Sequence, residues 1–307
     1  MSSMIISGAA SQALAAALAR ELEEPLARAE YDRFPDGELL ASVPDLASVG
    51  DGGDSDNSTD DTNTGTNTDR AIIVASTVSS DAHLELLQLQ DAAREAGISE
   101  VVTVLPYMGY ARQDKAFDTG HPISARAVAR AISSTTDRVL TVTPHEEAVC
   151  EFFEPTATAV DAADRLAEPL PDDLTDPVFL SPDAGAIDLA ETVRNAYGNG
   201  AGETDYFEKV RHSGTEVEIT PSDVDVEGRD VVVADDIIAT GSTMSEAVGV
   251  LQERGVGRVF VTCVHPLLAN NAVTKLSQAG VEAIYGTDTI ERQQSAVSVA
   301  PSIAAEL

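Results

Sequence analysis

Two adjacent carboxylates precede a run of small, hydroxyl-bearing residues in the segment VVVADDIIATGSTM, residues 231–244. Its leading apolar residues predict a short buried strand that ends at Asp235 and Asp236, and a helical pattern begins around residues 240–243 (TGST). Main-chain N–H groups at a helix N-terminus bind phosphate, while carboxylates accept hydrogen bonds from ribose hydroxyls or hold them through Mg²⁺. The segment therefore predicts a pocket for a phosphorylated pentose. The alternative is an acidic turn before a helix that one of the hydroxyls caps.

A second group of charged residues, Arg112-Gln113-Asp114-Lys115, stands in a loop expected at residues 106–122. The chain has only three lysines, at positions 115, 209 and 275. Arginine and lysine together on a glycine-containing loop therefore indicate a site for a polyphosphate, and the amide and acid beside them could read the edge of a base. The alternative is a solvated loop tip.

Four further segments carry aromatic, acidic, imidazole or basic side chains, and none of them specifies a ligand by itself. They are the turn Phe34-Pro35-Asp36-Gly37-Glu38, His145 past one expected strand, Asp183 past another, and the alternating pair Lys209 and Arg211. The turn offers an aromatic ring for an adenine face and carboxylates for its amino group and ribose, and the alternating cations share one face of a strand. Each segment also has an ordinary explanation, as a turn, a structural histidine, a helix cap or a surface ion pair.

Short apolar segments alternate with helical patterns, which predicts an α/β fold with mainly parallel sheets flanked by helices. The expected strands are residues 5–7, 39–43, 71–75, 101–105, 139–142, 178–180, 205–210, 215–219, 231–234, 258–264 and 281–285, with 205–210 and 215–219 antiparallel. The expected helices are residues 11–22, 81–95, 123–132, 161–167, 187–197, 243–254 and 271–278. We expect two tandem domains of one fold type, residues 1–153 and 154–307, with a linker at 154–159. Functional sites in such sheets lie at the carboxyl ends of the strands.

Two segments fall outside this alternation. Residues 50–69 (GDGGDSDNSTDDTNTGTNTD) contain no aliphatic side chain and cannot bury apolar surface, so they predict a disordered acidic insertion in a surface loop. Deletion of this insertion is expected to leave activity intact. The tail at residues 295–303 could add an edge strand.

The net charge of −33, from 52 acidic and 19 basic residues, limits the environment and the partners. Self-repulsion on this scale destabilises a compact state in dilute buffer, and molar salt shortens the Debye length to about 3 Å. We therefore predict a protein of a high-salt cytoplasm; the alternative is an acidic protein at ordinary salt. No basic face is expected for nucleic acid or anionic membranes. No apolar segment is long enough to span a membrane, and the N-terminus lacks the basic start of a signal peptide.

The motifs resemble those of a known family. Residues 231–244 resemble the phosphoribosyl-diphosphate-binding motif shared by type I phosphoribosyltransferases and ribose-phosphate pyrophosphokinases. The segment PYMGYARQDKAF (106–117), followed by HPISARAVA (121–129), resembles the ATP loop of the pyrophosphokinases, which phosphoribosyltransferases lack. The resemblance covers essentially the whole chain outside residues 50–69. It implies two tandem type I phosphoribosyltransferase-like domains, with the tail at 295–307 packing back on the first.

The resemblance also implies a reaction: the β,γ-diphosphoryl group of ATP passes to the 1-hydroxyl of ribose 5-phosphate, giving phosphoribosyl diphosphate and AMP, with Mg²⁺ as cofactor. The residues implied for ATP are Phe34, Asp36, Gly37, Glu38, Arg112 and Gln113. Those implied for ribose 5-phosphate are Arg211, Asp235, Asp236, Ala239, Thr240, Gly241, Ser242 and Thr243. His145 and Asp183 are implied as metal ligands, and Lys209 and Arg211 as catalytic. A homo-oligomer is implied, a dimer or a multiple of dimers, with an ATP site shared between subunits.

Three positions depart from the family pattern. Thr143 stands where bacterial members usually have an acid, Ala239 where an acid or serine is common, and Ser242 where glycine is usual. A main-chain phosphate site tolerates the last two, and Thr143 could alter metal binding. Two alternative functions remain open: a phosphoribosyltransferase, or a catalytically silent regulatory homologue that binds nucleotides and partners.

Overall fold

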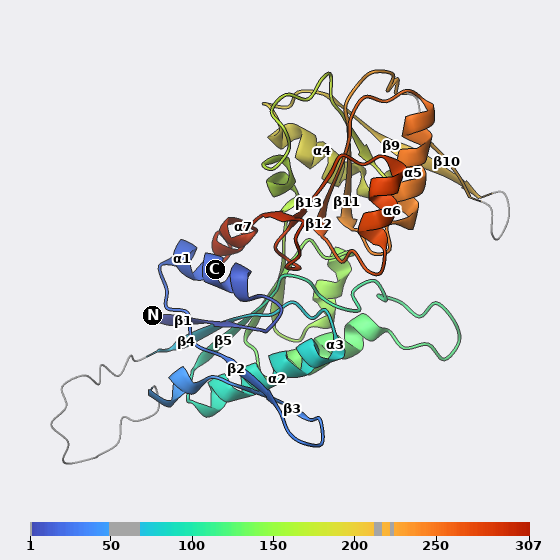
Figure 1. The fold of residues 1–307 in the computed structure, drawn as a ribbon. Helices are drawn as coiled ribbons and strands as arrows, with labels where there is room; N and C mark the ends of the chain where they lie inside the picture. Colours follow the sequence, from blue (N-terminus) through green and yellow to red (C-terminus); the bar gives the residue numbers. More distant parts are fainter. Residues whose placement is uncertain (1, 49–67, 212–216, 222–223) are drawn as a thin grey trace, which may run out of the picture. The chain divides into compact units, whose positions relative to one another are not determined.

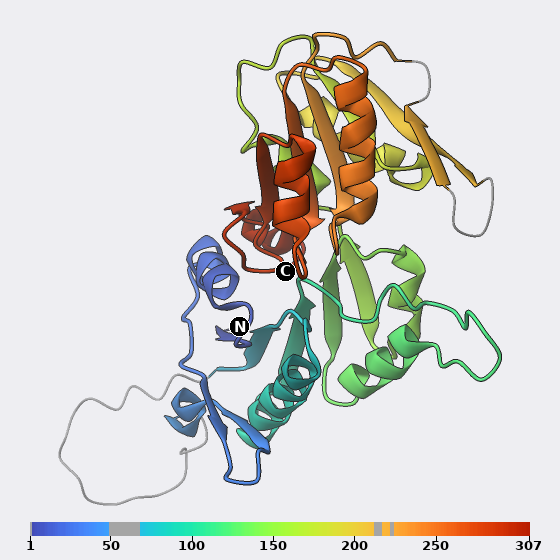
Figure 2. The same ribbon diagram turned by 45° about the vertical axis from the view of Figure 1, so that its right-hand side comes forward.

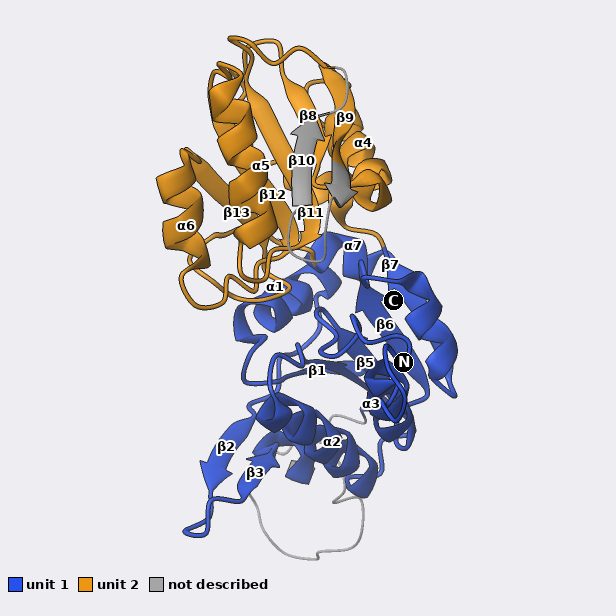
Figure 3. Cartoon of the chain, turned by 90° about the vertical axis from the view of Figure 1, so that its right-hand side faces the viewer, with its two compact units in different colours: residues 1–160, 300–307 blue, residues 161–299 orange. Residues whose placement is uncertain are grey.

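The computed structural model describes residues 2–48, 68–211, 217–221 and 224–307, with the main chain alone at 209–211 and 217–221. Most of the acidic insertion expected at 50–69 lies outside the described residues. The described chain forms two compact units, residues 1–160 with 300–307 and residues 161–299 (Figure 3). A compact unit need not be an independently folding domain, so the domain boundary at residue 153 stays a prediction.

The first unit contains a five-stranded, wholly parallel sheet covered by helices on both faces. Its strands lie in the order β1 (Ser3–Ser7), β4 (Arg70–Val74), β5 (Glu100–Leu105), β6 (Arg138–Val142) and β7 (Thr156–Val160). Figure 1 shows α2 (Ser80–Glu95) and α3 (Ser124–Ser133) on one face, and α1 (Gln12–Leu22) and α7 (Ala300–Ala304) on the other. Strands β1, β4, β5 and β6 are buried nearly throughout, as expected when both faces of a parallel sheet are covered.

A separate antiparallel hairpin packs against α2. It consists of β2 (Glu30–Arg33) and β3 (Leu39–Ser42). Gln88 of α2 fixes it, because its Oε1 accepts from Ala41 N at 2.6 Å and its Nε2 donates to Leu39 O at 2.9 Å. The connecting turn is exposed and reverses at Gly37, whose φ of +94° favours glycine.

The second unit contains a seven-stranded sheet in which only the edge strand β10 is antiparallel to its neighbour. The order is β10 (Val217–Pro221), β9 (Glu203–Arg211), β8 (Val178–Ser181), β11 (Val231–Ile237), β12 (Val259–His265), β13 (Ala283–Thr287) and β14 (Ser295–Val297). Helices α5 (Ser242–Glu253) and α6 (Ala272–Ala279) lie side by side on one face, and α4 (Ile187–Ala196) covers the other (Figure 2). The predicted α/β fold with two mainly parallel sheets is confirmed.

Three local expectations were wrong. The linker expected at 154–159 is largely strand β7, which pairs in parallel with β6. Its sequence, TATAV, is small and half-exposed, so its pairing depends on β6 rather than on its own apolar pattern. The helix expected at 161–167 is a short 3-10 helix, Ala163–Ala167. Strand β11 does not stop before the paired acids but continues through them to Ile237. The other short 3-10 helices are Pro44–Ser48, Glu147–Phe152 and Ala184–Ala186.

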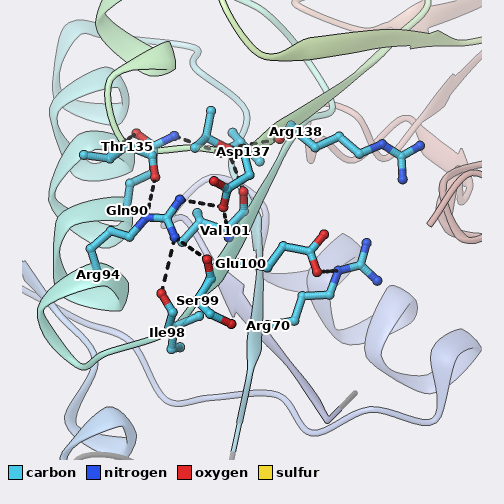
Figure 4. A network of polar contacts seen from close by, with 12 residues as sticks. Arg70, Gln90, Arg94, Ile98, Ser99, Glu100, Val101, Thr135, Asp137 and Arg138 are labelled. Carbon is cyan, nitrogen blue, oxygen red and sulfur yellow. Dashed lines mark hydrogen bonds and ion pairs between the residues drawn. The ribbon is translucent and has the colours of Figure 1, made fainter.

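The amino ends of strands in the first unit are joined by a polar network around Arg94 (Figure 4). Arg94 Nη2 donates to Asp137 Oδ2 at 2.5 Å, and its other N–H groups bind carbonyl oxygens before β5 and β6. Asp137 Oδ2 also accepts from Val101 N at 2.7 Å. The network therefore holds the end of α2 to two strands, on the edge of the sheet opposite to the carboxyl ends.

Among the residues that the structure describes, no helix has the length and apolar character to cross a membrane.

Candidate functional site

The predicted site residues of the second unit gather at the carboxyl edge of its sheet. Strands β9, β8 and β11 are neighbours and run parallel, so their carboxyl ends meet at one edge. Asp183 follows the end of β8. Asp235 and Asp236 lie near the carboxyl end of β11, beyond the residues of β11 that pair with β8. Ser181 at the end of β8 pairs with Tyr206, so residues 207–211 of β9, with Lys209 and Arg211, run past it toward this edge.

The charge on Asp235 is disfavoured where it lies. Burial raises the pKa of its carboxyl well above the usual value, and the negative charges of Asp236 and Asp183 raise it further. One hydrogen bond acts in the opposite direction, because Asp235 Oδ1 accepts from Asp236 N at 2.9 Å. A strongly perturbed carboxyl at the carboxyl edge of a sheet is typical of a functional site. A cation or a hydroxyl donor brought here would stabilise the ionised form.

The segment after these acids leads into the N-terminus of α5. Gly241 occupies the N-cap position with φ of +68°, in the left-handed region, and its carbonyl accepts the first helical bond from Ser245 N at 2.8 Å. Within the described chain, no side-chain oxygen caps this helix. The alternative of a helix capped by its own Ser242 or Thr243 hydroxyl is therefore wrong, and the first N–H groups of α5 can bind an anion.

A second segment braces the same loop from β12. Ile238 N donates to His265 O at 3.2 Å, Leu268 N to Ile238 O at 2.9 Å, and Ala269 N to Ala239 O at 2.8 Å. The ring of His265 is buried and its Nδ1 lies 2.9 Å from Thr289 Oγ1. These main-chain bonds fix Ile238 and Ala239, where the loop begins.

In the first unit, the loop at 106–122 follows the carboxyl end of β5 and is fixed where it begins. Gly109 N donates to Thr77 Oγ1 at 2.8 Å, and Thr77 N donates to Tyr107 O at 2.9 Å. A Cβ on Gly109 would lie 2.2 Å from Thr77 O, so only glycine fits. Sequence reasoning missed this constraint, because Thr77 is distant in the chain.

The predicted ATP residues of this loop differ in their surroundings. Arg112 is exposed, as expected of a residue that meets a ligand. Gln113 instead joins the middle of the loop to its carboxyl end: its Nε2 donates to Pro122 O at 3.3 Å, and its Oε1 accepts from Ser124 Oγ at 2.6 Å. The carboxamide of Gln113 therefore braces the loop in this structure.

The other residues of the first unit that were predicted to bind ATP or a metal ion are exposed. Phe34 is 49% exposed, and the turn carrying Asp36, Gly37 and Glu38 points no side chain into the core. His145 is exposed just beyond β6 and follows Thr143, whose φ is +35°. A β-branched residue in that region is strained by about 1–3 kcal/mol, and such strain clusters at functional sites.

The donor set suits a hard divalent cation, although the described residues contain no cluster of three or more His, Cys, Asp or Glu side chains arranged to hold a metal. Mg²⁺ commonly takes one or two carboxylates and completes its octahedron with waters and substrate phosphates. Asp183, Asp235 and Asp236 are close enough for their charges to interact, and their oxygens fit this ion. Of the two predicted ligands, His145 belongs to the first unit and Asp183 to the second.

Two mainly parallel sheets flanked by helices, one with paired acids ahead of an uncapped helix N-terminus, define a protein of the phosphoribosyl-binding α/β class. Family models agree. The N-terminal domain of ribose phosphate pyrophosphokinase matches residues 58–135, and the phosphoribosyl transferase domain matches residues 153–299.

Curated relatives extend this match over nearly the whole chain. The ribose-phosphate pyrophosphokinase of Halobacterium salinarum is 61% identical over 98% of this chain and 99% of its own. That of Methanopyrus kandleri is 41% identical over 94% of this chain and 92% of its own. The crystal structure of phosphoribosylpyrophosphate synthetase from Mycobacterium smegmatis covers 100% of this chain and 97% of its own, with a TM-score of 0.79 and 25% identity.

The chain belongs to the ribose-phosphate pyrophosphokinase family, and its reaction is the synthesis of phosphoribosyl diphosphate. This identity implies ATP and ribose 5-phosphate as the substrates. The match of residues 58–135 to the pyrophosphokinase N-terminal domain separates the chain from phosphoribosyltransferases.

Proposed function

We propose that the carboxyl edge of the second sheet binds ribose 5-phosphate for attack on ATP. The observation that carries this proposal is the raised pKa of Asp235, beside Asp236 and ahead of the uncapped N-terminus of α5. Acids that repel one another are stabilised by ribose hydroxyls or a cation, and the helix N-terminus is stabilised by a phosphate. A pentose 5-phosphate satisfies both demands with one molecule.

In this proposal each end of the pentose has its own partners. Asp235 and Asp236 accept hydrogen bonds from the ribose hydroxyls. The main-chain N–H groups of the loop Ala239-Thr240-Gly241-Ser242-Thr243 bind the 5-phosphate. The bonds that hold Ile238 and Ala239, at the start of this loop, support this because they limit the rearrangement that binding requires. The proposal leaves the 1-hydroxyl as the nucleophile.

The ATP partners proposed are Phe34, Asp36, Gly37, Glu38, Arg112 and Gln113. The 1-hydroxyl attacks the β-phosphorus in line, and AMP leaves. Transfer of this kind requires little covalent work from the protein, so positioning and charge neutralisation carry the rate. We assign charge neutralisation to Lys209 and Arg211, with Arg211 also near the pentose phosphate; their place on β9 beside β8 supports this.

Mg²⁺ is the proposed cofactor, with Asp183 and His145 as its protein ligands, and it would supply neutralisation of phosphate charge. We further propose a cytoplasmic homo-oligomer, a dimer or a multiple of dimers, with ATP sites shared between subunits. The turn at residues 34–38 supports this, because Phe34 is 49% exposed and the side chains of Asp36 and Glu38 are exposed as well.

Steady-state kinetics in molar KCl tests the assignment. AMP formation from ATP and Mg²⁺ should depend on ribose 5-phosphate. Asp236→Asn should raise KM for ribose 5-phosphate by about tenfold or more and KM for ATP far less. The control is Glu282→Gln, which removes an exposed acid of the same unit. No AMP from folded protein would favour a silent regulatory homologue, and equal KM values in both variants would contradict the assignment of the site.

A further inference from the structure

Lys275 of α6 contacts the loop assigned to the 5-phosphate. Its Nζ donates to Ser242 Oγ at 2.9 Å and lies 3.5 Å from Thr240 O. Helices α5 and α6 stand side by side (Figure 2). Lys275 therefore reaches Ser242 at the N-terminus of α5, although the two residues are 33 positions apart in the chain.

The charge of Lys275 is directed at the loop alone. Its ammonium contacts a hydroxyl and a carbonyl oxygen, and among the described residues no carboxylate lies within ion-pair distance of it. In a chain with 52 acidic residues and three lysines, a half-buried ammonium without an acid partner is unusual. A positive charge and an uncapped helix N-terminus therefore meet at the same loop, and both favour an anion.

The ammonium has three N–H donors, of which the hydroxyl and the carbonyl oxygen of the loop take two. We infer that Lys275 is a further phosphate-binding residue: Ser242 holds its ammonium at the loop, and the third N–H donates to an oxygen of the 5-phosphate. This inference rests on the proposed pentose site. It also gives Ser242, where glycine is usual in the family, a role as the partner that orients the lysine.

The test measures KM for each substrate and kcat in molar KCl. Lys275→Met keeps the apolar stem and removes the charge, and it should raise KM for ribose 5-phosphate about tenfold. KM for ATP and kcat should change less than twofold, because Lys275 does not contact the reacting atoms. Lys275→Arg should recover most of the lost affinity. Gln278→Ala, an exposed change on the same helix, is the matched control and should have no effect.

Two further variants separate the possible outcomes. In a Ser242→Gly background Lys275 keeps its contact with Thr240 O, so Lys275→Met should still raise KM for ribose 5-phosphate, but by less than in the wild type. No rise at all would mean that the lysine acts only through Ser242 and would overturn direct binding. A fall in Tm with equal changes in both KM values would assign Lys275 a structural role and overturn the inference as well. Thr243→Val is the reference for the pentose site. If Thr243→Val weakens ribose 5-phosphate and Lys275→Met does not, this inference fails while the proposed function stands; if neither weakens it, the proposed site fails.

Discussion

The Arg258 guanidinium binds the Asp230 carboxylate through two nitrogens, with Nε at 3.1 Å and Nη2 at 2.6 Å from Oδ2. Asp230 is 3% exposed and also accepts from two main-chain donors, Thr175 N at 2.7 Å and Arg258 N at 2.9 Å. One carboxylate therefore joins the segments that precede β8, β11 and β12. This lies at the amino ends of those strands, so its role is in stability rather than in chemistry.

Asp230→Asn should destabilise the protein by about 1–3 kcal/mol, because an amide cannot accept all of these hydrogen bonds and leaves buried donors without a partner. Denaturant unfolding in molar KCl measures the change, and kcat of the folded enzyme should stay within twofold. Asp137→Asn is the control from the first unit. Asp137 also forms an ion pair with an arginine, Arg94, but its side chain is 47% exposed. Asp137→Asn should therefore lower the free energy of unfolding by less than Asp230→Asn does. Equal losses would contradict the importance of burial.

The effect of Asp230→Asn should also depend on pH. Burial alone would raise the pKa of Asp230, but the hydrogen bonds from Arg258 and from Thr175 N lower it below its ordinary value of 3.8. The stability that the carboxylate provides is therefore present above pH 3.8 and is lost as the pH falls through its lower folded value. The difference between wild type and variant should shrink in that acidic range; a difference that grows there would contradict this reading.

Asp235→Asn should have the opposite effect on stability. Its raised pKa means that the folded protein holds this carboxylate at a cost, which appears as the pH rises above the ordinary value of 3.8 and is complete above the folded value. At neutral pH the variant should therefore gain on the order of 1 kcal/mol, measured by unfolding with chelator present and no substrate. The same variant should lose most of its activity. A loss of stability would mean that Asp235 is needed by the fold.

Lys209→Ala should lose most of kcat with only a modest change in either KM, because the assigned interaction forms as charge develops in the transition state. Initial rates at saturating ATP and ribose 5-phosphate measure it. Lys275→Met is the contrasting variant, since it should change KM for ribose 5-phosphate rather than kcat. Near-normal turnover by Lys209→Ala would remove this lysine from the mechanism.

Lowering KCl from molar concentration to about 0.1 M should unfold or inactivate the enzyme, because the Debye length grows from about 3 Å to about 10 Å and the net charge of −33 is then poorly screened. The far-ultraviolet circular dichroism signal and the rate of AMP formation should decrease together as the KCl concentration is lowered. Choline chloride at equal ionic strength should replace KCl as a stabiliser. Full stability in dilute buffer would contradict the high-salt prediction.

Local pattern was sufficient for elements whose burial follows their own sequence. Helix α2 was predicted at 81–95 and is observed at Ser80–Glu95, with Gly97 just past its end. Its apolar face was expected at Leu84, Leu87 and Ala92, and that part of the prediction was wrong, because Leu86, Leu89 and Ala93 are buried instead and Leu84 is 44% exposed. The paired acids were recognised for a similar reason, since they follow a run of buried valines in one short segment.

Contacts between distant segments explain what the pattern could not predict. Strand β7 exists through its pairing with β6, and its Thr-Ala-Thr-Ala sequence carries no strong strand pattern. Only glycine fits at position 109, because a Cβ there would collide with the carbonyl oxygen of Thr77. Thr77 lies in the loop after β4, whereas Gly109 lies in the loop after β5. Lys275 reaches Ser242 only because α5 and α6 pack together. Its rarity in a lysine-poor chain was the one signal that could have found it.

The first unit is made of two stretches of chain, and α7 belongs to the later one. Ala300 and Ile303 of α7 are buried, and α7 packs against α1. During synthesis residues 23–299 emerge between these two helices, which at about 5–20 residues per second occupies roughly 14–55 s. The surface of α1 that α7 covers stays open for that interval on the ribosome. The unit that is translated first is therefore the last to be completed, and nascent chains should need protection at α1 until residue 303 has emerged.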